Sequence, residues 1–220
     1  PEGPYVMLNQ WLANDMNGNY NGMVEFGEDI LIDAELKNWG SGDAENIITE
    51  LSSEDEYITI TDYSDDYGTI ASNDSVLNVS AFGFTVDDYV PDMHVVQFNL
   101  NIQENTREAW GSAFSLTIFA PVMEIGTLWV VDTLGGDGNY RLDPGETVQL
   151  VLDCHNTGHC DALTCLTALQ SSSPYITINN TSYSIETIPW AGMQQAVFTA
   201  TLADEIPAGT LIDFSTQLNS

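Results

Sequence analysis

Oxygen-bearing side chains recur between Asp15 and Glu28 at a spacing that suits a metal ion. Asp or Asn stands at every second position of the first half of this segment, glycines lie among them, and two glutamates follow. Ca²⁺ takes about six to eight oxygen ligands, and a glycine-containing loop can turn alternate side chains toward one centre. The predicted calcium ligands are Asp15, Asn17, Asn19, Asn21, Glu25 and Glu28.

A second acidic segment keeps part of this set 118 residues further on. Thr133 and Gly135 stand where Asp15 and Asn17 would recur, and Asp132 lies one residue away as a substitute. We predict a second, weaker calcium site here. The competing interpretation of both segments is that Asn, Asp and Gly simply favour turns. The ligands predicted for the second site are Asp132, Asp137, Asn139, Asp143 and Glu146.

The two acidic segments belong to an internal repeat. Residues 11–70 match residues 129–188 without a gap. Further along the chain the offset shrinks, because Phe98 is matched to Phe198. This match predicts that the first copy carries an insertion near residues 71–95.

Hydrophobic and polar residues alternate within each copy, and a period of two predicts β-strands. Residues 148–154 show the pattern clearly. Turn-forming residues interrupt such runs about every ten residues, and roughly seven short strands per hundred residues are typical of an immunoglobulin-like sandwich. The predicted fold class is therefore all-β, with two tandem immunoglobulin-like β-sandwich domains. With a boundary near Pro121, they span residues 1–120, including the insertion, and residues 121–220.

The second copy also resembles a known family. Its segment GDGNYRLDPGETVQLVLDCHNTGHCDALTCLTALQSSSPYITI is similar to the tandem immunoglobulin-like, CARDB-like modules of secreted and surface proteins of Bacteroidota and their relatives. Such modules are found beside gingipain-type cysteine peptidases. The resemblance covers residues 123–220 and, less closely, residues 5–120. It implies an extracellular, non-catalytic β-sandwich module carried on a larger chain.

Three cysteines lie in the second copy. Cys154 and Cys165 are expected to face the core on neighbouring strands, either as buried thiols or as a disulfide. The string from Cys154 through His155 and His159 to Cys160 matches no common zinc spacing, and successive strand residues point to opposite faces. A nucleophile formed by Cys160 and His159 would lack any visible oxyanion motif. We therefore predict that the protein is not an enzyme.

Five tryptophans raise the alternative of glycan binding. Trp11 and Trp129 recur between the copies, and we expect them to anchor the two cores. The tryptophans that do not recur lie in or beside predicted turns, where they would either bind a glycan or pack within loops. These candidate binding residues are Trp39, Trp110 and Trp190.

The charge balance excludes several classes of partner. The chain has 33 acidic and three basic residues, for a formal net charge of −30, whereas nucleic acids and anionic membranes bind basic side chains. No apolar run approaches the roughly 18 residues of a membrane span. We predict an extracellular, calcium-stabilised spacer, adhesion or assembly unit at the cell surface, whose partners are modules of the same or neighbouring chains. The alternatives are a carbohydrate-binding accessory module and a subunit of an extracellular fibre.

Overall fold

Alternating hydrophobic and polar residues form β-strands throughout the chain. A computed structural model describes residues 2–105 and 107–220, and within them lie fifteen strands and no helix. Strand β2, Asp29–Asn38, shows the physical reason. Every second residue from Ile30 onward is buried, so one face of the strand covers a core while the other lies toward solvent. No helix in the described ranges could cross a membrane.

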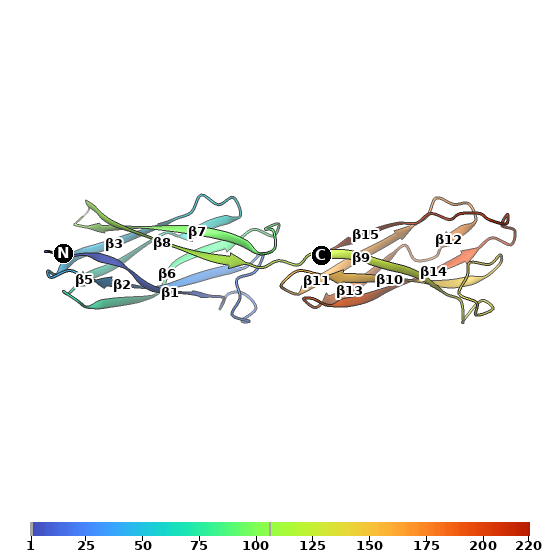
Figure 1. Ribbon diagram of the computed structural model, residues 1–220, viewed down its shortest axis with the longest axis horizontal. Helices are drawn as coiled ribbons and strands as arrows, with labels where there is room; N and C mark the ends of the chain where they lie inside the picture. The colour runs from blue at the N-terminus through green and yellow to red at the C-terminus, as the bar shows by residue number, and fades with distance from the viewer. Residues whose placement is uncertain (1, 106) are drawn as a thin grey trace. The chain divides into compact units, whose positions relative to one another are not determined.

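The chain divides into two compact units, Pro1–Ala120 and Pro121–Ser220, called unit 1 and unit 2. Unit 1 consists of two four-stranded antiparallel sheets with the orders β1-β2-β6-β4 and β5-β3-β7-β8 (Figure 1). Besides β2, its strands are β1 (Val6–Asn14), β3 (Ala44–Ser52), β4 (Ile58–Asp62), β5 (Ser64–Ile70), β6 (Ser75–Val86), β7 (His94–Glu104) and β8 (Arg107–Ile118).

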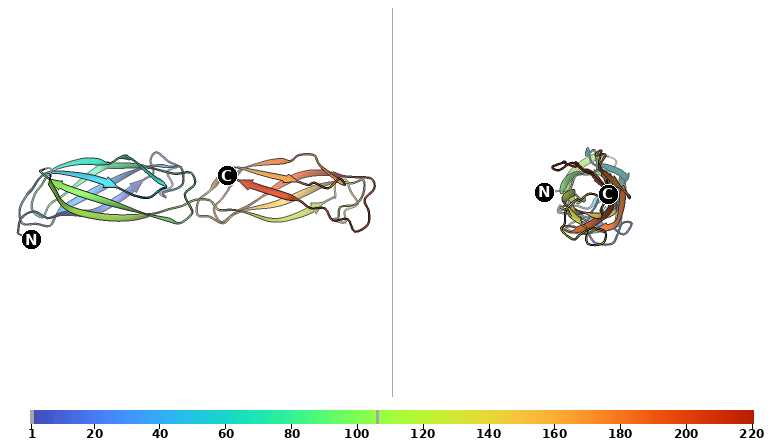
Figure 2. Two further views of the ribbon diagram at one scale, coloured as in Figure 1. Left: turned by 90° about the horizontal axis from the view of Figure 1, so that it is seen from above. Right: turned by 90° about the vertical axis from the view of Figure 1, so that its right-hand side faces the viewer.

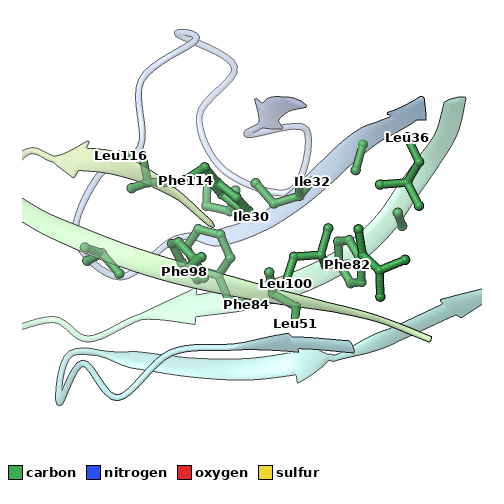
Figure 3. Close-up of a cluster of buried hydrophobic side chains, with 14 of the residues drawn as sticks. Ile30, Ile32, Leu36, Leu51, Phe82, Phe84, Phe98, Leu100, Phe114 and Leu116 are labelled. Carbon is green, nitrogen blue, oxygen red and sulfur yellow. The ribbon is translucent and has the colours of Figure 1, made fainter. Parts of the chain in front are cut away.

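The two sheets of unit 1 enclose a hydrophobic core rich in phenylalanine (Figure 3). Phe82 and Phe84 of β6 and Phe98 of β7 are fully buried. The Phe98 ring lies 5.0 Å from the Phe84 ring and 5.1 Å from the Phe114 ring of β8, measured between centroids. Trp11 of β1 lies 4.6 Å from Phe114, so this aromatic row joins the two sheets.

Unit 2 contains a four-stranded antiparallel sheet, β12-β14-β10-β9, and a three-stranded one, β13-β11-β15 (Figure 2). Leu150 and Phe198 lie fully buried in its separate core. Its strands are β9 (Met123–Val131), β10 (Thr147–Asn156), β11 (Ala162–Gln170), β12 (Ile176–Ile178), β13 (Ser182–Ile188), β14 (Met193–Leu202) and β15 (Ser215–Asn219).

The two units repeat the same topology. Strands β10, β11 and β13 begin 118 residues after β2, β3 and β5, and the sheet orders correspond strand by strand. Within residues 71–95, where the insertion is predicted, unit 1 is longer than unit 2 by only two residues. Ala34 pairs with Asn78 and Ile32 with Phe82, so β6 bulges by two residues opposite Asp33, whereas β14 pairs with β10 without a bulge. The insertion near residues 71–95 is therefore a two-residue bulge.

The match of Phe98 to Phe198 is wrong. Phe198 lies in β14, the counterpart of β6, whereas Phe98 lies in β7, whose counterpart is β15. The pairings of β7 with β3 and of β15 with β11 place Leu100 and Thr216 at equivalent positions, so the counterpart of Phe98 is Phe214. Among the described residues, unit 2 has no strand that corresponds to β8.

The expected core role of Trp129 is also wrong. Leu128 pairs with Leu152 in the same way as Trp11 pairs with Ala34, so β9 is shifted by one residue relative to the sequence match. A shift of one residue moves a strand side chain to the opposite face. Leu128 consequently packs on the core, while Trp129 is 42% exposed.

A buried asparagine ends the second strand of each unit, Asn38 in β2 and Asn156 in β10. The side-chain oxygen accepts two backbone N–H bonds, and the side-chain nitrogen donates to two backbone carbonyls, at 2.8–3.2 Å. The partners of Asn38 are Tyr5, Gly40, Gly42 and Ile70, and those of Asn156 are Val122, Gly158, Cys160 and Ile188.

Candidate cation-binding loops

The predicted ligands of unit 1 lie in the loop between β1 and β2, residues 15–28. The carbonyl of Asp15 accepts a hydrogen bond from the N–H of Gly18 at 2.7 Å, which closes a first turn. Tyr20 and Gly22 have positive φ angles of 63° and 81°, so the backbone turns back on itself. Asp15 Oδ2 accepts a bond from the N–H of Gly22 at 2.9 Å, which holds this carboxylate inside the loop.

Three carboxylates of this loop, those of Asp15, Glu25 and Glu28, are largely buried. Glu28 accepts the backbone N–H groups of Asn19 at 3.2 Å and of Glu25 at 3.0 Å. Glu25 accepts the side-chain amides of Asn19 and Asn21. Backbone and amide N–H groups, which carry no net charge, therefore hold all three acids in place.

Burial raises the pKa of the Glu28 carboxyl, and repulsion from the carboxylates of Glu25 and Asp15 raises it further. The hydrogen bonds from the N–H groups of Glu25 and Asn19 oppose this effect. A bound cation would supply the missing positive charge and would favour the ionised form of Glu28. The loop is therefore electrostatically suited to a cation.

The predicted ligands of unit 2 lie in the corresponding loop between β9 and β10, residues 132–146. The carboxylate of Asp132 is fully buried and accepts the backbone N–H groups of Asn139 at 3.0 Å and Tyr140 at 3.2 Å. The N–H of Asp137 donates to Glu146 Oε1 at 3.0 Å. The same kind of backbone cradle thus holds the acids of the second loop.

Asp132, Asp137 and Glu146 form a compact carboxylate cluster. Each offers one oxygen, and these atoms lie within 4.8 Å of one another. Glu146 Oε2 is buried and has no hydrogen-bond partner among the described residues. An ionised oxygen that is buried without a partner is costly, and a metal ion is one of the few ligands that can satisfy it. A cation in this cluster would remove that cost.

The two loops share one framework of hydrogen bonds and backbone conformations. In each, a backbone N–H binds the closing glutamate, and an asparagine amide binds the preceding acid. Positive φ angles fall at three equivalent positions, although glycine and tyrosine exchange places. The loop conformation therefore does not depend on one fixed set of turn-forming residue types. These positions are Tyr20, Gly22 and Gly27 in unit 1, and Gly138, Tyr140 and Gly145 in unit 2.

The structure places the predicted ligands in three groups. The first group comprises the cluster of Asp132, Asp137 and Glu146 and the equivalent residues of unit 1, which are Asp15, Asn19 and Glu28. Asp132 takes the place of Asp15 because β9 is shifted by one residue. The second comprises the asparagine–acid pairs beside it, Asn21 with Glu25 and Asn139 with Asp143. The third is Asn17, which is exposed and lies outside this network.

Cys154 and Cys165 are buried free thiols, so the disulfide between them is not formed. Cys154 Sγ lies 3.6 Å from Thr167 Oγ1 inside the core of unit 2. Burial raises the pKa of both Cys154 and Cys165. A thiolate is the nucleophilic and metal-binding form of cysteine, so these two are packing residues. Cys160 is only 2% exposed, which leaves a nucleophile at this position without access to substrate.

The three candidate glycan-binding tryptophans do not form a set of exposed rings. Lys37 Nζ lies 4.1 Å from the ring centroid of Trp39 and occupies one face of it. Trp110 is partly buried and packs against the core of unit 1, which favours the packing alternative at this position. Trp190 is 62% exposed. The three rings therefore differ, because Trp39 is 51% exposed and Trp190 is also exposed, whereas Trp110 is partly buried.

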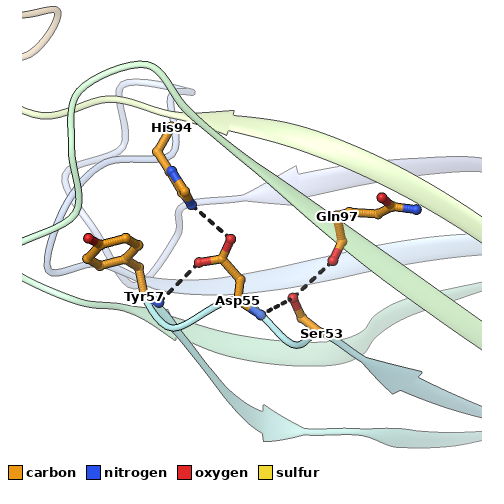
Figure 4. Close-up of polar contacts among 5 residues, drawn as sticks. All are labelled: Ser53, Asp55, Tyr57, His94 and Gln97. Carbon is orange, nitrogen blue, oxygen red and sulfur yellow. Dashed lines mark hydrogen bonds and ion pairs between the residues drawn. The ribbon is translucent and has the colours of Figure 1, made fainter.

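A histidine–aspartate pair in unit 1 was not anticipated by the sequence motifs (Figure 4). His94 Nε2 lies 2.8 Å from Asp55 Oδ2, and the Tyr57 ring packs edge-on against the imidazole at 5.0 Å. Asp55 also accepts the N–H of Tyr57, while Ser53 donates to the carbonyl of Gln97 at 2.9 Å. This cluster ties the β3–β4 loop to β7 and is structural in character.

Comparison with known proteins assigns no family to the chain: no protein-family model matches it, and no curated protein matches it. Solved structures give distant likenesses. A protein of unknown function from Porphyromonas gingivalis W83 is 12% identical with a TM-score of 0.29, over 90% of this chain and 83% of that one. Red sea bream transglutaminase is 12% identical with a TM-score of 0.37, over 97% and 29% of the two chains. The secreted serine protease VesC from Vibrio cholerae is 14% identical with a TM-score of 0.29, over 97% and 51%.

Proposed function

We propose that the protein is a non-catalytic, extracellular pair of immunoglobulin-like units that serves as a spacer, adhesion or assembly element, with one Ca²⁺ stabilising each unit. The observation that carries the proposal is the recurrence of one acid-holding loop framework in both units. Asp15 and Asp132 occupy the same place in this framework, although the sequence repeat aligns Asp15 with Thr133. Turn preference alone would not bury carboxylates together at equivalent places.

The immunoglobulin-like assignment is supported by the strand order. In unit 1, β2 and β6 lie inside one antiparallel sheet, and β3 and β7 lie inside the other. The first strand pairs with the second, and the third pairs with the seventh. Two antiparallel sheets in which consecutive strands cross from one sheet to the other characterise such sandwiches. Unit 2 has the same order for the strands that it contains.

The oxygen-only chemistry of the loops favours Ca²⁺. Asp132, Asp137 and Glu146 supply carboxylates in unit 2, and Asp15, Asn19 and Glu28 stand at the equivalent places of unit 1. Carboxylate, amide and backbone oxygens suit hard cations, whereas zinc and copper sites use histidine or cysteine. A Ca²⁺ ion in each loop would join the end of the first strand to the start of the second and stabilise the sandwich.

Calorimetric melting in CaCl₂ and in EGTA tests the proposal. Ligand binding to the folded state alone stabilises it by about 2.7 kcal/mol at a free concentration one hundred times Kd. Such a gain raises the melting temperature of a unit of roughly a hundred residues by more than about 10 °C. Equal melting temperatures in both media would refute the calcium site.

Charge-matched variants separate site binding from a general relief of acidic repulsion. Asp132→Asn and Glu146→Gln are expected to lose the Ca²⁺-dependent rise of unit 2. Glu205→Gln, which removes the same charge from an exposed position of unit 2, is expected to keep it. An equal loss in all three variants would show that Ca²⁺ acts on the overall charge and not on the cluster.

A further inference from the structure

The two glutamates of the loop in unit 1 have hydrogen-bond donors without a cation. Glu28 Oε1 and Oε2 accept the backbone N–H groups of Asn19 at 3.2 Å and of Glu25 at 3.0 Å. Both oxygens of Glu25 accept side-chain amides, one from Asn19 and one, at 3.0 Å, from Asn21. Each of the four oxygens of Glu25 and Glu28 therefore has a donor from the protein itself.

The closing glutamate of the loop in unit 2 lacks part of this bonding. Glu146 Oε1 accepts the N–H of Asp137 at 3.0 Å, but Oε2 is buried and has no partner among the described residues. In unit 1 the equivalent oxygen of Glu28 accepts the N–H of Glu25. A buried carboxylate oxygen without a donor is costly to keep ionised. The loop of unit 2 is therefore incomplete until a ligand from outside the chain reaches this oxygen.

One equivalent position changes the chemistry of the loop, Asn19 in unit 1 and Asp137 in unit 2. Oδ1 of each side chain accepts a backbone N–H two residues further on, at 3.0 Å and 3.1 Å. The other terminal atom of Asn19 is the nitrogen that donates to Glu25, whereas that of Asp137 is a second oxygen. Asn19 therefore supplies a donor to its own loop, and Asp137 supplies a further charged acceptor.

Asp137 completes a group of three carboxylates in unit 2. One oxygen of each of Asp132, Asp137 and Glu146 lies within 4.8 Å of the other two, and no other acidic, histidine or cysteine side chains of the described chain form such a group. The basic residue of the same loop, Arg141, is exposed and forms no ion pair with a described residue. An exposed charge is screened by water and salt. Arg141 therefore does not neutralise the three carboxylates.

We propose that unit 2 binds Ca²⁺ more tightly than unit 1 and that Asp137 and Asn19 set this order. The inference rests on the proposed cation sites, and its order is the reverse of the one expected from the sequence. In loops of one framework, the affinity for Ca²⁺ rises with the number of charged ligands. A cation in unit 2 also satisfies the buried oxygen of Glu146, whereas the glutamates of unit 1 already have their donors. Unit 2 therefore holds Ca²⁺ at concentrations too low to fill the loop of unit 1.

A Ca²⁺ titration of the full chain, followed by NMR of the backbone amides, tests this order. The N–H groups of Gly22 and Tyr140 are matched reporters, because they donate to Asp15 and Asp132 at equivalent places of the two loops. In chelator-buffered Ca²⁺, the Tyr140 signal is expected to shift at a free concentration at least about tenfold below that for Gly22, since unit 2 has one more charged ligand. Equal midpoints, or an earlier shift of Gly22, would overturn the inference.

Exchange of the two side chains tests their part in the order. Asp137→Asn is expected to weaken binding in unit 2 at least about tenfold, and Asn19→Asp is expected to strengthen binding in unit 1 by a similar factor. The double variant, which keeps the net charge, is expected to reverse the order of the Gly22 and Tyr140 shifts. An unchanged order in the double variant would overturn the inference.

Asn17→Asp is the matched control, because it adds the same charge to the loop of unit 1 at an exposed position outside the hydrogen-bond network. It is expected to move the Gly22 midpoint less than about threefold, since an exposed charge is screened. A shift equal to that of Asn19→Asp would overturn the role assigned to Asn19. Absence of Ca²⁺ binding in both loops would refute the proposed function together with the inference, whereas binding in both loops with equal or opposite midpoints would overturn the order alone.

Discussion

Replacement of Asn38 by Asp is expected to destabilise unit 1 severely although the two side chains have nearly the same size. The side-chain oxygen keeps its bonds from the N–H groups of Tyr5 and Gly40. The nitrogen that donates to Gly42 at 2.8 Å and Ile70 at 3.0 Å becomes an acceptor that faces two carbonyl oxygens. The site is 0% exposed, so water cannot replace the lost donors.

The size of the effect follows from these contacts. Each lost hydrogen bond removes about 1 kcal/mol, and each buried carbonyl left without a donor adds about 1–2 kcal/mol, for a total of about 4–6 kcal/mol. The stability of a whole domain is about 5–15 kcal/mol, so the variant lies near the limit of folding. Asn156→Asp is expected to have the same effect on unit 2, because Asn156 makes the same four bonds.

Urea unfolding, followed by circular dichroism and tryptophan fluorescence, measures the loss. Asn99→Asp is the matched control, since it makes the same chemical change on the exposed face of β7. The control is expected to change the unfolding free energy by less than about 0.5 kcal/mol. A loss below about 1 kcal/mol for Asn38→Asp, or a loss equal to that of the control, would refute the importance assigned to this bonding pattern.

Three further predictions concern loops of unit 1. The folded-state pKa of Glu28 is raised above 4.5, so the contribution of Glu28 to stability is present below that pH and is lost as the pH rises through the folded-state pKa. Urea unfolding in EGTA should therefore show that the unfolding free energy of the original chain falls with pH relative to that of Glu28→Gln, and a pH-independent difference would contradict the prediction. A double-mutant cycle between His94→Ala and Asp55→Ser should give a coupling of about 0.5–1 kcal/mol, and zero coupling would show that the 2.8 Å contact contributes no stability. Gly18→Ala should abolish the Ca²⁺-dependent melting shift of unit 1 alone, because a Cβ there collides with Glu28 Oε1, and an unchanged shift would contradict this placement.

The all-β class could be predicted from the sequence because strand periodicity is a local property. Residues 148–154 alternate, and the structure places Val148, Leu150, Leu152 and Cys154 in one core. The recurrence of the acidic segments was equally visible, since hydrogen bonds within each loop join residues only a few positions apart. The sequence match of Asn19 to Asp137 is confirmed, because the backbone N–H of each donates to the closing glutamate of its loop.

Residues whose role depends on a distant partner were predicted poorly. The role of Asn38 and Asn156 leaves no local signal in the sequence, because the carbonyls of Ile70 and Ile188 lie 32 residues away. The contact of His94 leaves no local signal either, because Asp55 lies 39 residues earlier, between β3 and β4. Trp110 read as a turn aromatic because only the packing of the two sheets shows that it covers the core.

The sequence by itself determined the period of the strands, the acidity of the two loops and the repeat that relates them. The pairing register of the strands determined which side chains face the core and which face the loops, because a shift of one residue reverses the face on which a side chain lies. That shift separates Trp129 from Trp11 and brings Asp132 to the place of Asp15.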